Sequence, residues 1–223
     1  MSHIAAETLT KDYGRGSAAV RALKGVSFEI DSGEFVAVMG ASGAGKSTIL
    51  SILGAMNAPT SGRLLVDGID VYALDGERRA DFRREFLGFV FQSFHLVPYL
   101  SVLENVELPL TITGKNRREQ RAMVLSALEQ VGLADKADRL PADISGGEQE
   151  RVAIARAIVN EPPILLADEP TGNLDSRTAT EIMSLLKRLH RRGMTIIMVT
   201  HNAECAAMAQ RSITVSDGTL AVN

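Results

Sequence analysis

The most informative part of the sequence is the glycine-rich run Gly40-Ala41-Ser42-Gly43-Ala44-Gly45-Lys46-Ser47-Thr48. It follows a short apolar run, residues 35–39, and leads into residues 49–53, which can continue as a helix. The order strand, glycine loop and helix, with the spacing G-x-x-x-x-G-K-[ST], is that of a phosphate-binding P-loop. A chance glycine turn is the alternative, and the strand and helix on either side argue against it. We therefore expect residues 40–48 to bind a nucleotide, because such glycines let backbone N–H groups turn toward phosphate oxygens at the positive end of a helix.

Two side chains of this loop have more specific expected roles. Lys46 would reach the β- and γ-phosphates of the nucleotide, and Ser47 would supply a hydroxyl ligand to Mg²⁺.

Length and charge limit the classes of protein that remain. The 223 residues suffice for one large domain, or for one core with a subdomain. The net charge of -3, without a block of like charges, does not indicate a nucleic-acid or anionic-membrane partner. The single cysteine, Cys205, excludes an intramolecular disulfide, and its alanine-rich surroundings predict a packed side chain.

The sequence shows no targeting pattern. Residues 1–10 lack a basic region followed by an apolar one, and no apolar run approaches the ~20 residues that span a bilayer. We expect a cytosolic chain that reaches a membrane only through a partner.

The first part of the chain predicts strands around the P-loop. Residues 4–39 have the alternation of β-strands separated by short turns, and Asp67-Gly68 between two apolar runs predicts a hairpin. A charged helical segment, residues 77–86, leads to residues 87–91, which are apolar on both faces as a buried parallel strand requires. Tyr13, near the end of the first strand, could stack on an adenine ring or be a half-buried strand residue.

The second part is first helical and then alternates between strand and helix. From residue 93 to about residue 160 the pattern is helical, with helices expected from Asn116 to Gly132 and from about Ser145 to Val159. Alternation follows: a buried strand at residues 164–167, a helix that ends at Gly193, a buried strand at residues 195–199 and a hairpin at Asp217-Gly218.

Polar side chains follow the ends of three apolar strands. They are Gln92, Asp168, Glu169 and His201. Ligands of open parallel sheets collect at the carboxyl ends of the strands. We expect Asp168 to hold Mg²⁺, directly or through water, and Glu169 to accept a proton from the water that attacks the γ-phosphate. Gln92 could contact the metal or this water, and His201 could hydrogen-bond the γ-phosphate; taken singly, each could also be an ordinary loop residue.

A second helix end has the features of an anion site. Residues 144–151 read Ile-Ser-Gly-Gly-Glu-Gln-Glu-Arg, and Ser145 followed three residues later by Glu148 is a capping box. Gly146 and Gly147 expose N–H groups at the positive end of this helix. Because the chain already has a P-loop, this end would serve the nucleotide of another copy; an ordinary capped helix is the alternative.

The chain resembles the ATP-binding subunits of ABC transporters over essentially its whole length. Tyr13 falls where that family places its adenine-stacking aromatic residue. Six motifs occur in the family's order: residues 40–48 (Walker A), Gln92 (Q-loop), residues 145–148 (signature), residues 164–169 (Walker B), residues 173–175 (D-loop) and His201 (H-loop).

The resemblance implies both the fold and the assembly. The fold would be an α/β P-loop NTPase with a RecA-like parallel-sheet core and an N-terminal antiparallel β subdomain, residues 1–92 and 161–223, and an inserted helical subdomain, residues 93–160. The assembly would be a head-to-tail homodimer. Two ATP molecules would lie between one copy's P-loop and Ser145, Gly146, Gly147 and Glu148 of the other.

The resemblance also implies an ATPase coupled to transport. Water would attack the γ-phosphate in line, with Lys46, Gln92, Glu169 and His201 as catalytic residues and Ser47, Gln92 and Asp168 holding Mg²⁺. The partner would be an integral-membrane permease, so that the chain works at the cytoplasmic face of the inner membrane. The apolar residues Phe94–Leu100 would border the groove that receives a helix of the permease, or would pack inside the helical subdomain.

Residues 91–98, 104–106 and 167–175 are most similar to the MacB/LolD/FtsE group. Its permeases serve macrolide or peptide export, lipoprotein release or control of cell-wall hydrolysis. The signature usually begins Leu-Ser-Gly-Gly-Gln, and here Ile144 and Glu148 replace its ends. We expect Glu148 to turn back and cap its own helix, and Glu150 to lie on a solvated helix face.

Two other classes fit the sequence less well. A soluble ABC-type ATPase of DNA repair or translation would carry coiled-coil insertions, zinc-binding cysteines or two P-loops, and the sequence has none of these. An unrelated P-loop kinase or GTPase would leave residues 145–148 unexplained.

Overall fold

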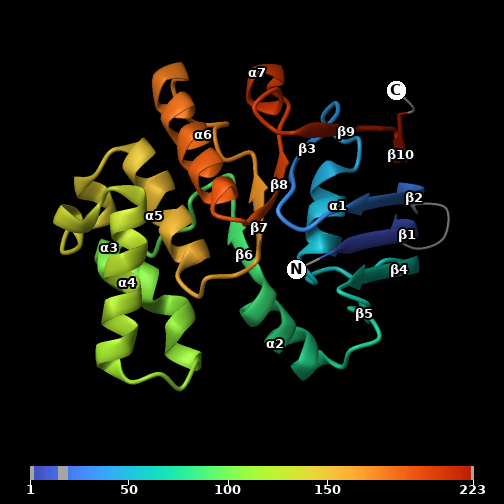
Figure 1. The fold of residues 1–223 in the computed structure, drawn as a ribbon. Helices are drawn as coiled ribbons and strands as arrows, with labels where there is room; N and C mark the ends of the chain where they lie inside the picture. The colour runs from blue at the N-terminus through green and yellow to red at the C-terminus, as the bar shows by residue number, and fades with distance from the viewer. Residues whose placement is uncertain (1–2, 15–19, 222–223) are drawn as a thin grey trace.

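Two β-sheets organise the structure, a computed structural model that describes residues 3–14 and 20–221 (Figure 1). The larger sheet has the order β10-β9-β3-β8-β7-β6, and its neighbouring strands are parallel except β9 and β10. Its strands are β3 (Phe35–Met39), β6 (Leu87–Val90), β7 (Ile164–Asp168), β8 (Thr195–Val199), β9 (Arg211–Ser216) and β10 (Thr219–Leu220). The predicted parallel sheet and the hairpin at Asp217-Gly218 are confirmed.

The smaller sheet is antiparallel and combines chain segments from both sides of the P-loop. Its order is β2-β1-β4-β5, formed by β1 (Ile4–Tyr13), β2 (Val20–Ile30), β4 (Ser61–Val66) and β5 (Ile69–Asp70). The predicted hairpin at Asp67-Gly68 joins β4 to β5. Val66 of β4 lies opposite Ile4 of β1, so residues that follow the P-loop complete the N-terminal sheet. Residues 15–19, in the stretch predicted as strands and turns, lie outside the described residues.

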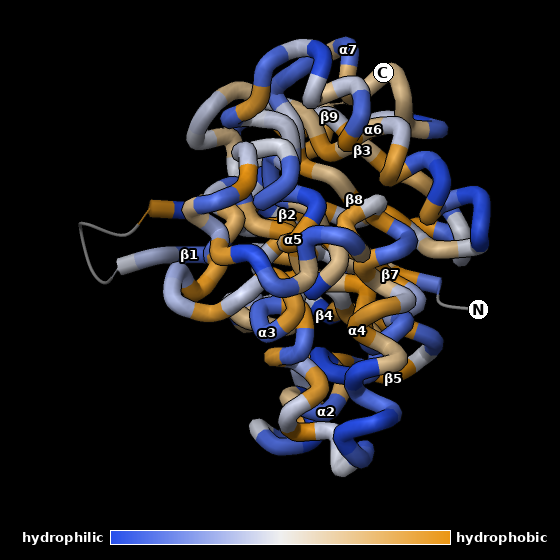
Figure 2. Tube along the Cα trace, turned by 90° about the vertical axis from the view of Figure 1, so that its left-hand side faces the viewer, coloured by the Kyte–Doolittle hydropathy of each residue, from blue (hydrophilic) through white to orange (hydrophobic). Residues whose placement is uncertain are grey.

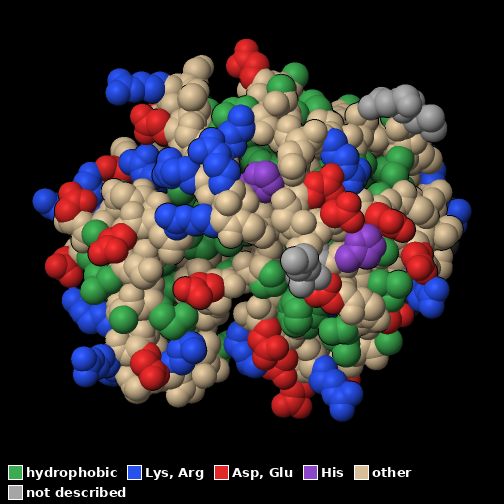
Figure 3. Space-filling model, in the orientation of Figure 1, with side chains coloured by type: hydrophobic (Ala, Val, Ile, Leu, Met, Phe, Trp, Pro, Cys, Tyr) green, Lys and Arg blue, Asp and Glu red, His purple; other side chains and the backbone are tan. Residues whose placement is uncertain are grey.

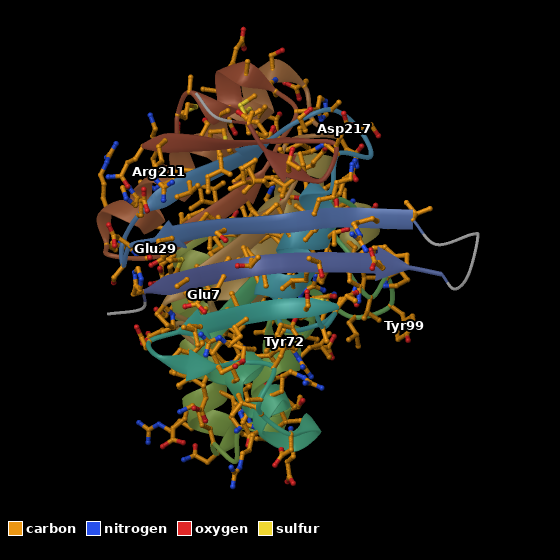
Figure 4. All side chains as sticks on the ribbon, turned by 90° about the vertical axis from the view of Figure 1, so that its right-hand side faces the viewer. Glu7, Glu29, Tyr72, Tyr99, Arg211 and Asp217 are labelled. Carbon is orange, nitrogen blue, oxygen red and sulfur yellow. The ribbon has the colours of Figure 1, made fainter. Side chains whose placement is uncertain are left out.

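Arg211 of β9 connects the two sheets. In Figure 4 it lies at the same end of the molecule as Glu29 of β2, and its guanidinium donates a hydrogen bond to the Glu29 carbonyl oxygen. The same guanidinium forms an ion pair with Glu34, in the turn between β2 and β3. This contact holds β9 against the antiparallel sheet, at the end of the larger sheet where β3 and β9 begin.

Alternate side chains of the larger sheet enter two hydrophobic cores. Val36 and Val38 of β3 face α1 (Lys46–Leu53) and the smaller sheet, whereas Phe35 and Ala37 face the helices on the other side. Successive side chains of a strand point to opposite faces of the sheet. A strand covered on both faces must therefore be apolar throughout, which explains the continuous apolar runs of β3, β7 and β8.

Most of the helices are inserted between β6 and β7, on the left in Figure 1. They are α3 (Val102–Glu107), η2 (Leu108–Ile112), α4 (Arg117–Val131), η3 (Ala134–Lys136), η4 (Pro141–Asp143) and α5 (Gly146–Ile158). The helices predicted from Asn116 and Ser145 are α4 and α5, and both begin with a capping box, which was predicted for Ser145 and Glu148. Gly132 ends α4 in the left-handed conformation.

The remaining helices are α2 (Gly76–Phe86), α6 (Ser176–Arg191) and α7 (Ala203–Ala206). Figure 2 shows α2 as mainly hydrophilic, and it buries Phe82. Figure 3 shows Lys and Arg side chains gathered over α6, whose last turn carries Arg188 and Arg191. Positive charge at this end complements the helix dipole.

Cys205 of α7 is buried with its Sγ 3.4 Å from the Thr171 hydroxyl, as expected of a packed side chain. Across residues 3–14 and 20–221, no helix combines the length and hydrophobicity needed to cross a membrane.

Candidate active site

The loop between β3 and α1 packs closely against both β2 and β9. Gly40, Gly43 and Gly45 have φ angles of 152°, 78° and 109°. A Cβ atom on Gly40 would lie 2.2 Å from the carbonyl oxygen of Val215 in β9, and one on Gly45 would lie 2.8 Å from that of Ala22 in β2. Both positions therefore require glycine, for space as well as for backbone conformation.

Lys46 opens α1 and lies across the loop. Its side chain is mostly buried, and its Nζ donates hydrogen bonds of 2.9 Å to the carbonyl oxygens of Gly40 and Ala41. No described side chain caps the N-terminus of α1. The first N–H groups of this helix and the ammonium of Lys46 therefore form a positive end suited to a phosphate.

A cavity of about 650 Å³ lies in front of this loop. It is lined by Ala22, Ser42, Gly43, Gly45, Lys46, Ser47, Thr48, Gln92, Glu169 and His201. The structure thus brings the P-loop and three of the four strand-end residues to one place. The other predicted loop residues, Gly40, Ala41 and Ala44, are not among the lining residues.

Glu169 and His201 form a pair at the edge of the cavity. Glu169 Oε2 lies 2.9 Å from His201 Nδ1, and the Glu169 backbone N–H donates a 2.9 Å hydrogen bond to the carbonyl of Val199. The Glu169 φ of 47° is unusual for a side chain of this size. This backbone position directs the carboxylate toward the imidazole, so that both groups can act on one substrate atom.

Gln92 follows β6, and the segment after β7 holds its backbone. The side-chain amide of Asn173 donates a 3.0 Å hydrogen bond to the Gln92 carbonyl oxygen. This bond connects the predicted Q-loop to the predicted D-loop across 81 residues of sequence. Sequence reasoning did not predict it, because the acceptor is a backbone atom.

Asp168 ends β7, behind the lining residues of the cavity. Burial raises its pKa, and so does the charge of Glu169, while Lys46 lowers it. Two adjacent carboxylates therefore form an electronegative site with a lysine as its nearby cation. Oxygen donors from Ser47, Gln92 and Asp168 suit Mg²⁺, which takes one or two carboxylates and completes its shell with phosphates and water.

The donor set is open rather than a closed metal cage. Within the described ranges, no group of three or more His, Cys, Asp or Glu side chains could hold a metal by itself. The residues present fit a metal that arrives with a nucleotide, because phosphate oxygens supply the missing ligands.

Tyr13 lies beside the P-loop helix rather than in the cavity lining. Its hydroxyl accepts a 2.7 Å hydrogen bond from Asn57 and lies 3.5 Å from the Thr48 hydroxyl. The ammonium of Lys11 lies 5.2 Å from the ring centroid. The ring is 41% exposed, which leaves surface on which a base could stack.

Ser145 and Gly146, at the start of α5, are exposed and do not line the cavity of their own chain. Glu148 Oε2 accepts a 2.9 Å hydrogen bond from the Ser145 backbone N–H, and its Oε1 pairs with the Lys136 ammonium. The Lys136 contact and the Ser145 N–H lower the pKa of Glu148 to about 2. The predicted cap is present, and Lys136 is a partner that the sequence did not indicate.

The two glycines of this turn differ in their surroundings. A Cβ atom on Gly147 would lie 2.2 Å from Thr178 Cγ2 of α6, so Gly147 is required for the packing of α5 against α6. A Cβ atom on Gly146 would meet nothing closer than 3.9 Å. The packing of the chain therefore requires glycine at position 147 but not at position 146.

The prediction for Glu150 was wrong. Its side chain is 1% exposed, and burial raises its pKa to about 8, although the charge of Arg156 lowers it. The residues at i+3, i+4 and i+7 from Glu150 are Ala153, Ile154 and Ala157, all buried. This spacing places Glu150 on the apolar stripe of α5, a signal that the sequence contains.

Arg156, near the end of α5, was also missed. Its guanidinium donates hydrogen bonds of 2.6 Å to the carbonyl oxygens of Phe94 and His95. These two residues have φ angles of 37° and 48°. Arg156 thus fixes a left-handed turn immediately after Gln92.

Residues 94–100 combine the two alternatives expected from sequence. Leu96 packs against the core, whereas Tyr99 is 77% exposed and projects from the molecule in Figure 4. Buried Asn105 accepts a hydrogen bond from the Val97 N–H and donates to the carbonyls of Val97, Leu100 and Ser101. The segment is therefore anchored from inside and exposed at its tip.

Comparison with known proteins places these features in a family. The family model described as ABC transporter matches residues 23–172. An uncharacterised ABC transporter ATP-binding protein of Methanocaldococcus jannaschii is 46% identical over 215 residues, which cover 96% of this chain and 96% of that protein.

A longer relative and a solved structure extend the comparison. The macrolide export ATP-binding/permease protein MacB of Chlorobium luteolum is 50% identical over 208 residues, 93% of this chain but 31% of MacB. The chain thus spans about a third of the length of this relative. A dimeric post-hydrolysis structure of the ATP-binding cassette MJ0796, bound to ADP and Pi, matches with a TM-score of 0.90 and 43% identity over 98% of this chain and 97% of that one.

Proposed function

Because this chain belongs to the ABC transporter family, we propose that it is the ATP-binding and ATP-hydrolysing subunit of a transporter and energises a membrane permease. The observation that carries the catalytic part is the Glu169–His201 pair, which lines the same cavity as Lys46, Ser47 and Gln92. A carboxylate base, a hydrogen-bonding imidazole and a phosphate-binding loop are the groups that attack of water on a γ-phosphate needs. The soluble DNA-repair or translation alternative is not favoured, because the relatives are transporter proteins.

Each side chain of the site has a separate role in ATP binding or hydrolysis. Lys46 and the N–H groups of the loop bind the phosphates, and Glu169 orients the attacking water and takes its proton. His201 fixes the Glu169 carboxylate and can donate to the γ-phosphate. When bound, Mg²⁺ neutralises charge on the β- and γ-phosphates, and Ser47 and Gln92 would hold it, with Asp168 directly or through water. Tyr13 would stack on the adenine.

A homodimer would complete the site. The cassette MJ0796 is dimeric in its ADP- and phosphate-bound structure. In the present chain, Ser145, Gly146, Gly147 and Glu148 start a helix and are not among the residues that line their own P-loop cavity. In the dimer these residues would face the γ-phosphate bound by the other copy, at the positive end of α5.

The permease would dock beside residues 94–100, at the cytoplasmic face of the membrane. A groove of about 370 Å³ lies between α2, β6, η2 and the end of α5, and Ile112 and Phe89 are among its lining residues. Arg156 also lines this groove and holds the carbonyls of Phe94 and His95. The groove thus continues into the segment that follows Gln92. The relatives make a MacB-type export permease the partner class that we favour.

Hydrolysis is tested with variants that separate binding from chemistry. Glu169→Gln should keep ATP binding and lose about 10²- to 10⁴-fold in turnover, as expected on removal of a general base. Lys46→Ala should lose ATP binding itself. Glu204→Gln changes an exposed carboxylate in α7 and is the matched control. Equal turnover by E169Q and E204Q would contradict the assignment of Glu169.

Dimerisation is tested by sedimentation of E169Q with ATP and Mg²⁺. A dimer that requires ATP supports the composite site, and a monomer at high protein concentration, also in the presence of the permease, would contradict it.

The permease proposal is tested by copurification from detergent-solubilised membranes. Ile112→Glu should release an integral-membrane protein that the unmodified chain retains, because a charge in the groove disfavours an apolar helix. Retention of the same membrane protein by Ile112→Glu would contradict docking in this groove.

A further inference from the structure

The fifth residue of the signature stretch, Glu148, raises an electrostatic problem. The N-terminus of a helix carries the equivalent of roughly +0.5 charge, whereas an ionised carboxylate carries a full negative charge. Glu148 lies in the first turn of α5, so its charge alone would outweigh the attraction of this helix end for a phosphate. A helix that receives ATP from a second copy therefore needs a way to neutralise Glu148.

Lys136 meets this need. Its ammonium pairs with Glu148 Oε1, while Glu148 Oε2 accepts the Ser145 N–H at 2.9 Å. Both carboxylate oxygens are thus engaged within the chain. The Glu148 side chain is 16% exposed and that of Lys136 is 35% exposed, so the pair is partly shielded from solvent. With Lys136 included, the end of α5 keeps its net positive character.

The backbone around Lys136 is fixed rather than mobile. Its N–H donates a 3.0 Å hydrogen bond to the carbonyl of Leu133, which is 1% exposed. The next residue, Ala137, accepts a 2.8 Å hydrogen bond from Leu103 of α3. Lys136 is therefore held at a set distance from α5, as a residue that positions charge must be.

We propose that Lys136 is a positioning residue that neutralises Glu148 and so allows the N-terminus of α5 to accept the phosphates of ATP bound by a second copy. This inference rests on the proposed composite site. It assigns to a residue outside the family's motifs a role in ATP-driven dimerisation. The merely structural alternative is that the pair only ties η3 to α5.

The experiment is a double-mutant cycle in the E169Q background, with dimer affinity measured by sedimentation in ATP and Mg²⁺. The variants are Lys136→Met, Glu148→Gln and both together. Lys115→Met changes an exposed lysine in the loop before α4 and is the control with the same change of net charge. Thermal unfolding of each variant without nucleotide measures the structural part of the pair.

The expected result is strong coupling between the two positions. Lys136→Met should weaken the dimer about tenfold, because an uncompensated carboxylate then faces the phosphates. The same change in the Glu148→Gln background should weaken the dimer less than about twofold, within the scatter of such cycles, because no carboxylate is then left to neutralise. The tenfold loss should shrink as salt rises from about 0.05 M to about 0.5 M, since screening reduces repulsion between exposed charges. Lys115→Met should have no effect.

Three outcomes would overturn the inference. One is an unchanged dimer affinity in Lys136→Met. A second is an equal loss of dimer affinity from Lys136→Met in both backgrounds. A third is a loss of affinity that does not depend on salt and follows the loss of thermal stability, as expected if the pair only stabilises the fold. If E169Q itself forms no ATP-dependent dimer, the composite site is refuted, and the proposal for Lys136 with it. If E169Q does form the dimer, the Lys136→Met variants test the proposal for Lys136 alone.

Discussion

Replacing Glu150 with glutamine is expected to stabilise the fold at neutral pH. Glu150 is 1% exposed, and its Oε1 has no hydrogen-bond partner among the described residues. Burial raises its pKa to about 8 despite the opposing charge of Arg156. Glutamine has nearly the shape of a protonated glutamate and cannot ionise. E150Q therefore removes the free-energy cost of holding a proton on Glu150 at neutral pH and keeps the packing of α5.

The size of the effect depends on pH. Between the ordinary pKa of 4.5 and the folded value of about 8, the folded chain holds a proton on Glu150 that the unfolded chain releases. The free energy of unfolding therefore falls as pH rises through this window, by at most about 1.4 kcal/mol per pH unit, and no further above it. At pH 7 the free energy of unfolding of the unmodified chain should therefore be about 3 kcal/mol lower than that of E150Q. Below pH 4.5 the two proteins should be about equally stable.

Urea unfolding followed by circular dichroism, at several pH values between about 5 and about 8, measures this difference. Glu129→Gln, an exposed carboxylate of α4, is the matched control and should show no pH-dependent gain. The difference between E150Q and the unmodified chain should widen steadily with pH. A difference that is the same at both ends of the range, or an E150Q chain that is less stable throughout, would show that Glu150 ionises normally beside Arg156.

Four further substitutions test the helix end and the segment after Gln92. Gly147→Ala should destabilise the fold by about 1–3 kcal/mol in urea unfolding, since its Cβ would overlap Thr178. Gly146→Ala should leave unfolding nearly unchanged, because its Cβ would make only ordinary van der Waals contacts within the chain, and should weaken the ATP-dependent dimer measured by sedimentation. Glu148→Gln should keep ATPase activity within about threefold, on the order of 0.7 kcal/mol in barrier, and a hundredfold loss would contradict the capping interpretation. Asn105→Ala should lower the free energy of unfolding by about 2 kcal/mol in urea, because it leaves partly buried N–H and carbonyl groups of residues 97–101 without a partner.

The sequence predicts those parts of the site that lie within a single stretch. Residues 40–48 contain their own strand, loop and helix, and Ser145 and Glu148 contain their own cap, so local spacing suffices for both. Asp168 and Glu169 were also predictable, because an apolar run places them at the end of a buried strand. The structure brings Glu169, Gln92 and the P-loop into one cavity as this interpretation requires.

The contacts that were missed join residues far apart in the chain. Arg156 donates hydrogen bonds to carbonyl oxygens 61 and 62 residues away. Because every residue has a backbone carbonyl, the sequence does not show which one is the acceptor. Lys136 lies 12 residues from Glu148, across a turn whose geometry depends on the packing of Leu133. Glu150 is a different case, since the helical spacing of its apolar neighbours was present and the charge of the residue outweighed it in the prediction. Position on a helix face was here the better guide than residue type.

α5 connects the three parts of the proposed mechanism. Its first turn carries Ser145 and Glu148, which would meet the other copy's ATP, and about 15 Å further along Arg156 holds the turn that follows Gln92. Arg156 also lines the groove proposed for the permease. Because a helix is stiff over this length, closure of the dimer on its first turn must displace either the packing of α5 or the turn at residues 94–95. Gly147 packs closely against Thr178 of α6, so we expect α5 and α6 to move together. The turn held by Arg156, with its two left-handed residues, is therefore where ATP-driven movement would pass to a membrane partner.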